Sequence, residues 1–125
     1  GMTDMAWHTL TEPFEGDVEQ FEAVSMAPTQ VLPVVSGTAM APAFGHIFSG
    51  GYAAGYYGYK WAEVLEADAF SLFKEKGIFN REAASSFREN VLAKGGTEHP
   101  MELYVRFRGH KPETRALIEK MGLGK

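Results

Sequence analysis

Apolar residues recur at helical spacing in several segments of the chain, and residues that cap or break helices separate these segments. The predicted helices span residues 17–27, 49 or 50 to 76, 80–94, 100–109 and 112–122. Asp17 with Gln20 forms a capping box, and Asn80 can cap a first turn. Pro100 and Pro112 fit first turns, where no backbone N–H is needed. Because little of the remaining sequence favours strands, this pattern predicts an all-α fold.

A long segment without helical periodicity, residues 28–44, separates two of these predicted helices and contains three prolines and a glycine. We expect an irregular connector there, with a short strand at residues 31–35 left open as an alternative. Connectors of this length inside a compact domain are usually functional or unusually well packed.

The composition is typical of a globular protein, with 45% apolar and 22% charged residues in a chain of 125 residues. This length suits one domain, and we predict that residues 1–125 form a single helical unit. Gly1 before Met2 is interpreted as an expression remnant. The net charge of −4 and the absence of a clustered basic stretch argue against a nucleic-acid partner.

Cysteine is absent from the sequence, which excludes disulfides and thiolate chemistry and fits a reducing compartment. No apolar run approaches the roughly 20 residues that span a bilayer, and no signal peptide is visible. We therefore predict a cytoplasmic protein with no membrane partner.

The stretch GHIFSGGYAAGYYGYKW combines four tyrosines, five glycines and one histidine. On a continuous helix, Tyr52, Tyr56 and Tyr59 would share one face, whereas Tyr57 would lie on a packing stripe. Glycine inside a helix indicates close approach by another backbone or by a ligand. Periodicity alone leaves two interpretations open: aromatic packing, or a row of phenol donors that face a cleft and can stabilise an oxyanion.

The stretch FGHIFSGGYAAGYYGYKWAEV and the later segments FRENVLAKGGTEHPMELYVRFRGHKP and LIEKMGL closely resemble one known family. It is the thimet oligopeptidase family of zinc metallopeptidases, in its bacterial oligopeptidase A and peptidyl-dipeptidase branch. The resemblance reaches back through VLPVVSGT and DMAWHTL, and so covers nearly the whole chain. It implies the helical C-terminal segment of a mostly helical zincin-type oligopeptidase, whose deep channel admits short peptides as substrates.

The resemblance also implies roles for individual residues. The family histidine that precedes the paired glycines corresponds to His46, and the first and last family tyrosines correspond to Tyr52 and Tyr59. These three are the implied catalytic residues, expected to hydrogen-bond the scissile carbonyl group or its tetrahedral form. The implied substrate-binding residues are Gly50, Gly51 and Tyr56.

The sequence departs from the family pattern because it contains no H-E-x-x-H motif, which supplies two zinc ligands and the glutamate general base. Its histidines are His8, His46, His99 and His110, and none has another histidine four residues away. We therefore expect no cofactor in this chain, zinc in the full-length family enzyme, and no peptidase activity from the chain alone. The chain is interpreted as about the last fifth of a longer peptidase.

Two functions of different classes stay open. In the first, the chain is the C-terminal portion of a zinc oligopeptidase, and its partner is the remainder of the catalytic domain. In the second, it is a stand-alone, non-catalytic helical module that binds peptides or pairs with a separately encoded catalytic half. An H-E-x-x-H motif encoded upstream of Met2 would favour the first. Because the isolated chain would expose apolar surface, we expect it to form homo-oligomers.

Three acidic residues on the long predicted helix have a simpler interpretation than a metal cluster. Glu63, Glu66 and Asp68 are predicted to form a solvated face, because no histidine accompanies them at ligand spacing. His8, beside Trp7, is predicted to be a hydrogen-bonded packing residue rather than a metal ligand.

Overall fold

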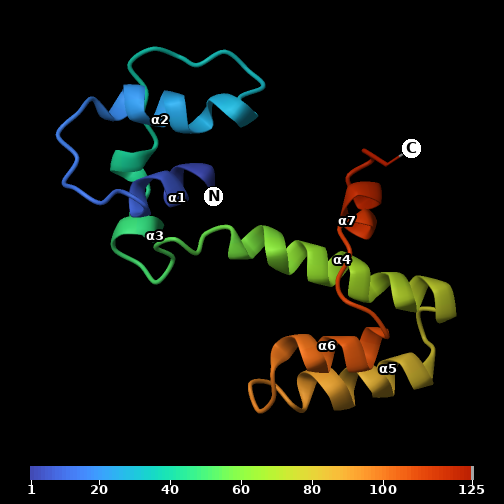
Figure 1. Ribbon diagram of the computed structural model, residues 1–125. Coiled ribbons are helices and arrows are strands. Elements are labelled where there is room, and N and C mark those ends of the chain that lie inside the picture. The colour runs from blue at the N-terminus through green and yellow to red at the C-terminus, as the bar shows by residue number, and fades with distance from the viewer. Residues whose placement is uncertain (125) are drawn as a thin grey trace. The chain divides into compact units, whose positions relative to one another are not determined.

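Residues 1–124 are described by a computed structural model, in which the chain forms two compact units, Gly1–Tyr59 and the part from Lys60 onward (Figure 1). Helices are the regular structure of these residues, and residues 1–124 contain no strand, which confirms the all-α prediction. The alternative of a short strand at residues 31–35 is therefore wrong. That both units belong to one domain stays a prediction. No helix of the described residues is long and apolar enough to cross a bilayer.

The first unit is built from short helices around an aromatic centre. Its elements are α1 (Met2–His8), α2 (Val18–Met26), the 3₁₀ turns η1 (Ala27–Thr29) and η2 (Ala41–Ala43), and α3 (Gly45–Phe48). Trp7 of α1 packs against Phe14, Phe21 and Phe48, with ring centroids 5.0, 4.2 and 6.0 Å away. Trp7 is therefore packed among aromatic rings, which are large contributors to core packing, whereas Met2, Met5 and Leu10 stay exposed.

The connector between α2 and α3 is irregular, as predicted, and two glutamates of α2 hold its backbone. The carboxylate of Glu22 accepts hydrogen bonds from the N–H groups of Met40, at 2.7 Å, and Ala41. Glu19 accepts one from the N–H of Gly37, at 2.8 Å. These bonds satisfy backbone donors that have no helical or sheet partner, so the connector is ordered by side chains from the preceding helix.

The second unit contains longer helices. Its elements are α4 (Gly58–Lys76), of which Gly58 and Tyr59 still belong to the first unit, α5 (Arg81–Phe87), the π-helical turn η3 (Arg88–Leu92), α6 (Pro100–Arg108) and α7 (Arg115–Lys120). Figure 1 shows α5 and α6 side by side, where the rings of Phe87 and Phe107 lie 5.1 Å apart. Phe73 of α4 approaches both rings, at 6.2 and 6.3 Å. This aromatic group forms the centre of the second unit.

Most predicted helix ends in the second unit are confirmed. The Asn80 side chain accepts the N–H of Ala83 at 2.9 Å, and Pro100 is the first residue of α6. Gly77 and Gly109 follow their helices with φ of +106° and +88°, in the left-handed region that favours glycine.

Three predicted boundaries are wrong. The long helix α4 begins at Gly58, not at residue 49 or 50, and α7 begins at Arg115, not at Pro112. The helix predicted for residues 80–94 changes to a π-helical turn at Arg88. Gly58 and Pro112 lie at or near the true starts of α4 and α7, but local propensity does not select the exact residue, and no glycine or proline marks the change at Arg88.

The prediction of a solvated face on α4 is wrong for Asp68, which is 3% exposed. The Tyr104 hydroxyl of α6 donates a hydrogen bond to its carboxylate. Arg108 donates from Nε to the Asp68 carbonyl at 3.1 Å and from its guanidinium to Ser71 Oγ at 2.8 Å. Burial, together with the hydrogen bond to Asp68, raises the pKa of Tyr104 well above its usual value. These polar bonds join α4 to α6.

Candidate functional site

The predicted site residues lie on three successive pieces of the first unit. His46 is on α3, Tyr52 and Tyr56 lie in the turn of residues 51–57, and Tyr59 is in the first turn of α4. Tyr52 and Tyr56 are therefore not on a helix, which corrects the prediction that one continuous helix aligns the three tyrosines. Ala54 has φ of +52°, a left-handed value that a continuous α-helix does not allow.

The turn nevertheless brings the four side chains together. The His46 ring lies 6.0 Å from Tyr52 and 6.2 Å from Tyr56, measured between centroids. Tyr59 is stacked on Tyr52 at 5.3 Å with an interplanar angle of 26°, and lies 5.2 Å from Tyr56. Phe44 packs edge-on against Tyr56 at 4.7 Å. We call His46, Tyr52, Tyr56 and Tyr59 the His/Tyr cluster.

The His/Tyr cluster can offer hydrogen-bond donors to a ligand. Tyr52 and Tyr59 are 39% and 50% exposed, so their phenol groups are open to an incoming molecule. Interaction with the Tyr52 hydroxyl, aided by partial desolvation, raises the pKa of Tyr59. Tyr59 is therefore protonated at neutral pH, and a neutral phenol donates one hydrogen bond.

Tyr57 lies outside the His/Tyr cluster. Its side chain is 57% exposed, which contradicts its predicted place on a packing stripe. On α4, Val64 is buried at 7% exposure, so the core face of this helix begins after Tyr57.

The glycines of the tyrosine stretch differ in what surrounds them. A Cβ atom on Gly50 would come within 2.9 Å of the His46 carbonyl oxygen, which is too close for any other residue without a backbone shift. Gly51 and Gly58 have nothing within 4 Å of such an atom, and Gly55 has only ordinary contacts from 3.7 Å. The glycines predicted close approach by another backbone or by a ligand. The backbone approach occurs at Gly50, against the His46 carbonyl oxygen, and not at Gly55 or Gly58.

Asp4 of α1 is the residue of this site that the sequence analysis missed. Its carboxylate is fully buried and accepts the N–H groups of Ala54 and Tyr56, each at 2.9 Å. His8 Nδ1 lies 2.8 Å from the same carboxylate and 2.8 Å from the Asp4 carbonyl oxygen, in agreement with a hydrogen-bonded role for His8. Burial opposes ionisation of Asp4, but the two backbone donors and His8 outweigh it and lower its pKa. The only feature of the sequence that pointed to this role of Asp4 was its place as a single acidic residue in the apolar segment TDMAWHTL.

Within residues 1–124, no group of three or more His, Asp or Glu side chains is placed to hold a metal ion. The chemistry that the described residues offer in the His/Tyr cluster is hydrogen bonding by phenol and imidazole groups.

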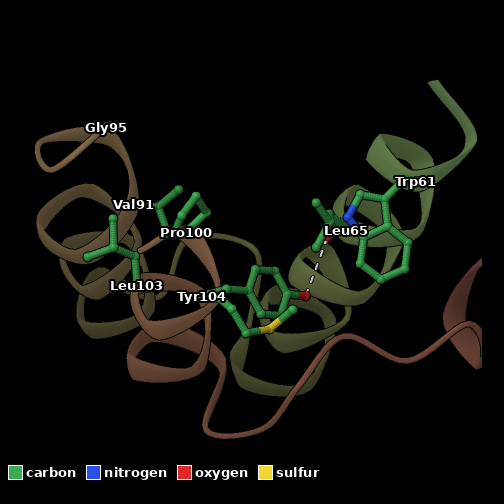
Figure 2. Close-up of a pocket in the computed structure, with 8 residues that line it drawn as sticks. Trp61, Leu65, Val91, Gly95, Pro100, Leu103 and Tyr104 are labelled. Atoms are coloured by element: carbon green, nitrogen blue, oxygen red, sulfur yellow. Dashed lines mark hydrogen bonds between the residues drawn. The ribbon is translucent and has the colours of Figure 1, made fainter. Parts of the chain in front are cut away.

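The second unit contains an apolar pocket of about 210 Å³ beside α4 and α6. It is lined by Trp61, Leu65, Val91, Gly95, Pro100, Met101, Leu103 and Tyr104. Figure 2 shows the Tyr104 ring between the two helices, and its dashed line marks the 3.5 Å approach of the hydroxyl to the Leu65 carbonyl, which is secondary to the shorter hydrogen bond with Asp68. None of the predicted site residues lines this pocket.

Comparison with known proteins gives the family. The sequence profile of Peptidase family M3 matches residues 1–123. The chain belongs to this family. The resemblance inferred from the sequence motifs is thereby confirmed, and the family is one of peptidases.

Similar proteins of known name fit the M3 assignment. Oligopeptidase A of Salmonella typhimurium is 48% identical over 125 residues, and oligopeptidase A of Escherichia coli is 47% identical over 124 residues. Dipeptidyl carboxypeptidase of Salmonella typhimurium is 39% identical over 124 residues. Each match covers 98% of this chain and 18% of the relative, so the chain spans less than a fifth of the length of these proteins.

Proposed function

We propose that this chain is the C-terminal portion of a zinc-dependent oligopeptidase that hydrolyses short peptides, and that the His/Tyr cluster forms part of its active site. The observation that carries the proposal is the convergence of His46, Tyr52, Tyr56 and Tyr59, with neighbouring rings 5.2 to 6.2 Å apart. Membership of the M3 family and the similarity to proteins named oligopeptidase A support it.

In this proposal the chain contributes hydrogen-bond donors. Attack on a peptide bond develops negative charge on the scissile carbonyl oxygen, and preorganised donors aimed at that oxygen lower the barrier. Tyr59, Tyr52 and His46 would supply those donors. Zinc, where bound, would polarise the carbonyl group or activate the attacking water. The described residues do not fit a zinc site, so the metal and the general base would come from the rest of the catalytic domain, which is the proposed partner of this chain.

The same region would contact the substrate backbone. Tyr56 lies between Tyr52 and Tyr59 in the sequence and touches both rings, so its hydroxyl is the proposed further contact. Gly50 and Gly51 are the other proposed substrate contacts: Gly51 leaves open space beside the exposed Tyr52, and Gly50 lets the backbone pass close to the His46 carbonyl oxygen.

The second proposed function is a stand-alone, non-catalytic helical module that binds peptides or pairs with a separately encoded catalytic half. It is favoured by the fact that the contacts that form the His/Tyr cluster all come from residues of the first unit. Calorimetry of the 125-residue chain with a short peptide separates the two functions, because only the module binds the peptide without the remaining domain. A cytoplasmic location and self-association of the isolated chain are further parts of the proposal.

Steady-state kinetics of Tyr59→Phe test the first function. The enzyme is a chimera in which this chain replaces the matching segment of the Escherichia coli relative. Phenylalanine keeps the ring and removes only the hydroxyl donor, so kcat should fall by roughly 10²–10³ with little change in KM. Tyr57→Phe is the matched control, because it removes the same atom from a residue outside the cluster. Equal turnover of the Tyr59→Phe variant and its parent would contradict the proposal.

A further inference from the structure

We propose that Asp4 is a positioning residue for the His/Tyr cluster: its carboxylate holds the backbone of residues 54–56 and so sets where Tyr52 and Tyr56 present their hydroxyl groups. The inference deepens the function proposed for that cluster and rests on it.

The contacts of Asp4 join two parts of the chain that are about 50 residues apart. Oδ1 accepts the N–H of Ala54 and Oδ2 accepts the N–H of Tyr56, each at 2.9 Å. His8 Nδ1 lies 2.8 Å from Oδ1, on the same side of α1. The carboxylate is fully buried, so these groups replace the water that it would otherwise bind. Both oxygens are therefore committed to the turn and to His8.

The turn needs an external support of this kind. Ala54 has φ of +52°, which residues with a Cβ atom rarely adopt unless the surroundings hold them there. The N–H groups of residues 54 and 56 point to Asp4 rather than into a regular helix. Loss of the carboxylate would leave the left-handed conformation without its main support, and Tyr52 and Tyr56 would lose their fixed positions.

A carboxylate suits this role better than a neutral side chain of the same shape. Two donor N–H groups face Asp4, one at each oxygen. Asparagine has a single acceptor oxygen, and its NH₂ group would oppose the other N–H. The exchange of Asp4 for asparagine therefore keeps the volume of the side chain but breaks one of the two contacts with the turn.

A purely local role is the competing explanation. Asp4 lies in the first turn of α1, where an acidic side chain stabilises the helix dipole without any partner. That role predicts a less stable α1 and an unchanged turn. The positioning role predicts a loosened turn and a change in catalysis that depends on the tyrosines, so the two explanations differ in what they alter.

The first measurement is amide hydrogen exchange in the 125-residue chain. Asp4→Asn should lower the protection of the Ala54 and Tyr56 amides by roughly tenfold or more, because asparagine offers one acceptor oxygen for two N–H groups. Glu19→Gln is the matched control. It changes another carboxylate that accepts a backbone N–H, that of Gly37 at 2.8 Å, and should leave the amides of residues 54 and 56 unchanged. Unchanged protection in Asp4→Asn overturns the inference.

The second measurement is steady-state kinetics in the Escherichia coli chimera described above. Asp4→Asn should lower kcat by roughly 10-fold to 100-fold with a small change in KM, as expected when donors to a transition state are displaced. The double variant with Tyr52→Phe should lose less than the product of the two single effects, because the interaction made by Tyr52 is weakened by both changes. Fully additive losses would show that Asp4 acts elsewhere and would overturn the inference.

The outcomes separate this inference from the proposed function. If Tyr52→Phe and Tyr59→Phe both turn over like the parent, the proposed function is wrong, and hydrogen exchange still decides whether Asp4 holds the turn. If those variants are impaired while Asp4→Asn is fully active, the positioning role is wrong. Asp4→Glu is the second variant, for the case in which Asp4→Asn does not fold. It keeps the charge and shifts the carboxylate by one methylene. A wild-type kcat in this variant, together with unchanged amide protection, would equally overturn the inference.

Discussion

Both units pack around aromatic rings, but their buried carboxylates make different kinds of contact. In the first unit, buried carboxylates of short helices accept hydrogen bonds from irregular backbone, as Asp4 does from the turn and Glu22 from the connector. In the second unit, longer helices pack through aromatic rings, and the buried Asp68 bonds to a side chain, Tyr104, of another helix.

The difference follows from where backbone hydrogen bonds can be made. A helix satisfies its own interior N–H and C=O groups, so helices need only matching apolar faces to associate. An irregular segment has donors without regular partners, and distant side chains must accept them. Of the predicted functional residues, Tyr52 and Tyr56 lie on such a segment, which agrees with the general tendency of binding residues to lie on loops held by a rigid scaffold.

The largest effect is expected where the second unit depends on ring packing. Phe107→Ala removes a side chain that is 5% exposed and lies between Phe73 and Phe87. The free energy of unfolding of the second unit should fall by about 3–5 kcal/mol. Denaturant unfolding followed by Trp61 fluorescence, in a Trp7→Phe background, reports on this unit alone because the chain has two tryptophans.

Phe79→Ala is the matched control for that experiment. Phe79 belongs to the same unit but is 95% exposed, so its truncation should barely change the unfolding midpoint. Similar losses for the two phenylalanines would mean that ring packing does not order the second unit.

A smaller effect is expected from a methyl group added to the first unit. Gly50→Ala places a Cβ atom within 2.9 Å of the His46 carbonyl oxygen, and relief of this clash should cost about 1–3 kcal/mol. Gly51→Ala adds the same atom where nothing lies within 4 Å, and should be tolerated. Unfolding followed by Trp7 fluorescence, in a Trp61→Phe background, compares the two variants. A larger loss for Gly51→Ala would contradict the described turn.

Acid should weaken the first unit through Asp4. Because the pKa of this carboxyl is lower in the folded chain than its usual value of 3.8, its contribution to stability is fully present above about pH 4. The contribution disappears as the pH falls through the lowered pKa. The free energy of unfolding, followed by Trp7 fluorescence from pH 6 to about pH 2, should therefore decline more in the parent than in Asp4→Asn, which cannot titrate there. Parallel curves would show that the carboxylate does not stabilise the unit.

The smallest effect is expected at the surface of the second unit. Arg106 and Lys94 form ion pairs with Glu98 at 2.8 and 3.0 Å, and hydrogen bonds from Arg106 and then Lys94 lower its pKa to about 2. Solvent reaches these groups and screens them, so Glu98→Gln should leave the unfolding midpoint nearly unchanged. A loss as large as that of Phe107→Ala would show that surface charge, and not ring packing, orders this unit.

Much of the second unit could be predicted from its sequence. Asn80 caps α5, Pro100 opens α6, and Gly77 and Gly109 end helices in the left-handed conformation. Each of these helix ends depends on the conformational preferences of one residue and its close neighbours, and these residues can be read directly from the sequence. The same reasoning identified the all-α class, because helical spacing of apolar residues can be recognised without knowing which element the helix packs against.

Motifs in both units also indicated the peptidase family, which the M3 profile confirms, and the tyrosine motif indicated the residues of the His/Tyr cluster, but the sequence could not determine how these residues meet. Helical spacing placed Tyr52, Tyr56 and Tyr59 on one helix face, whereas the structure brings them together across a turn. The turn depends on Asp4, about 50 residues earlier, and the burial of Asp68 depends on Tyr104. Contacts between residues so distant in sequence leave no local pattern, because the partner of a buried carboxylate is decided only when the chain folds around it.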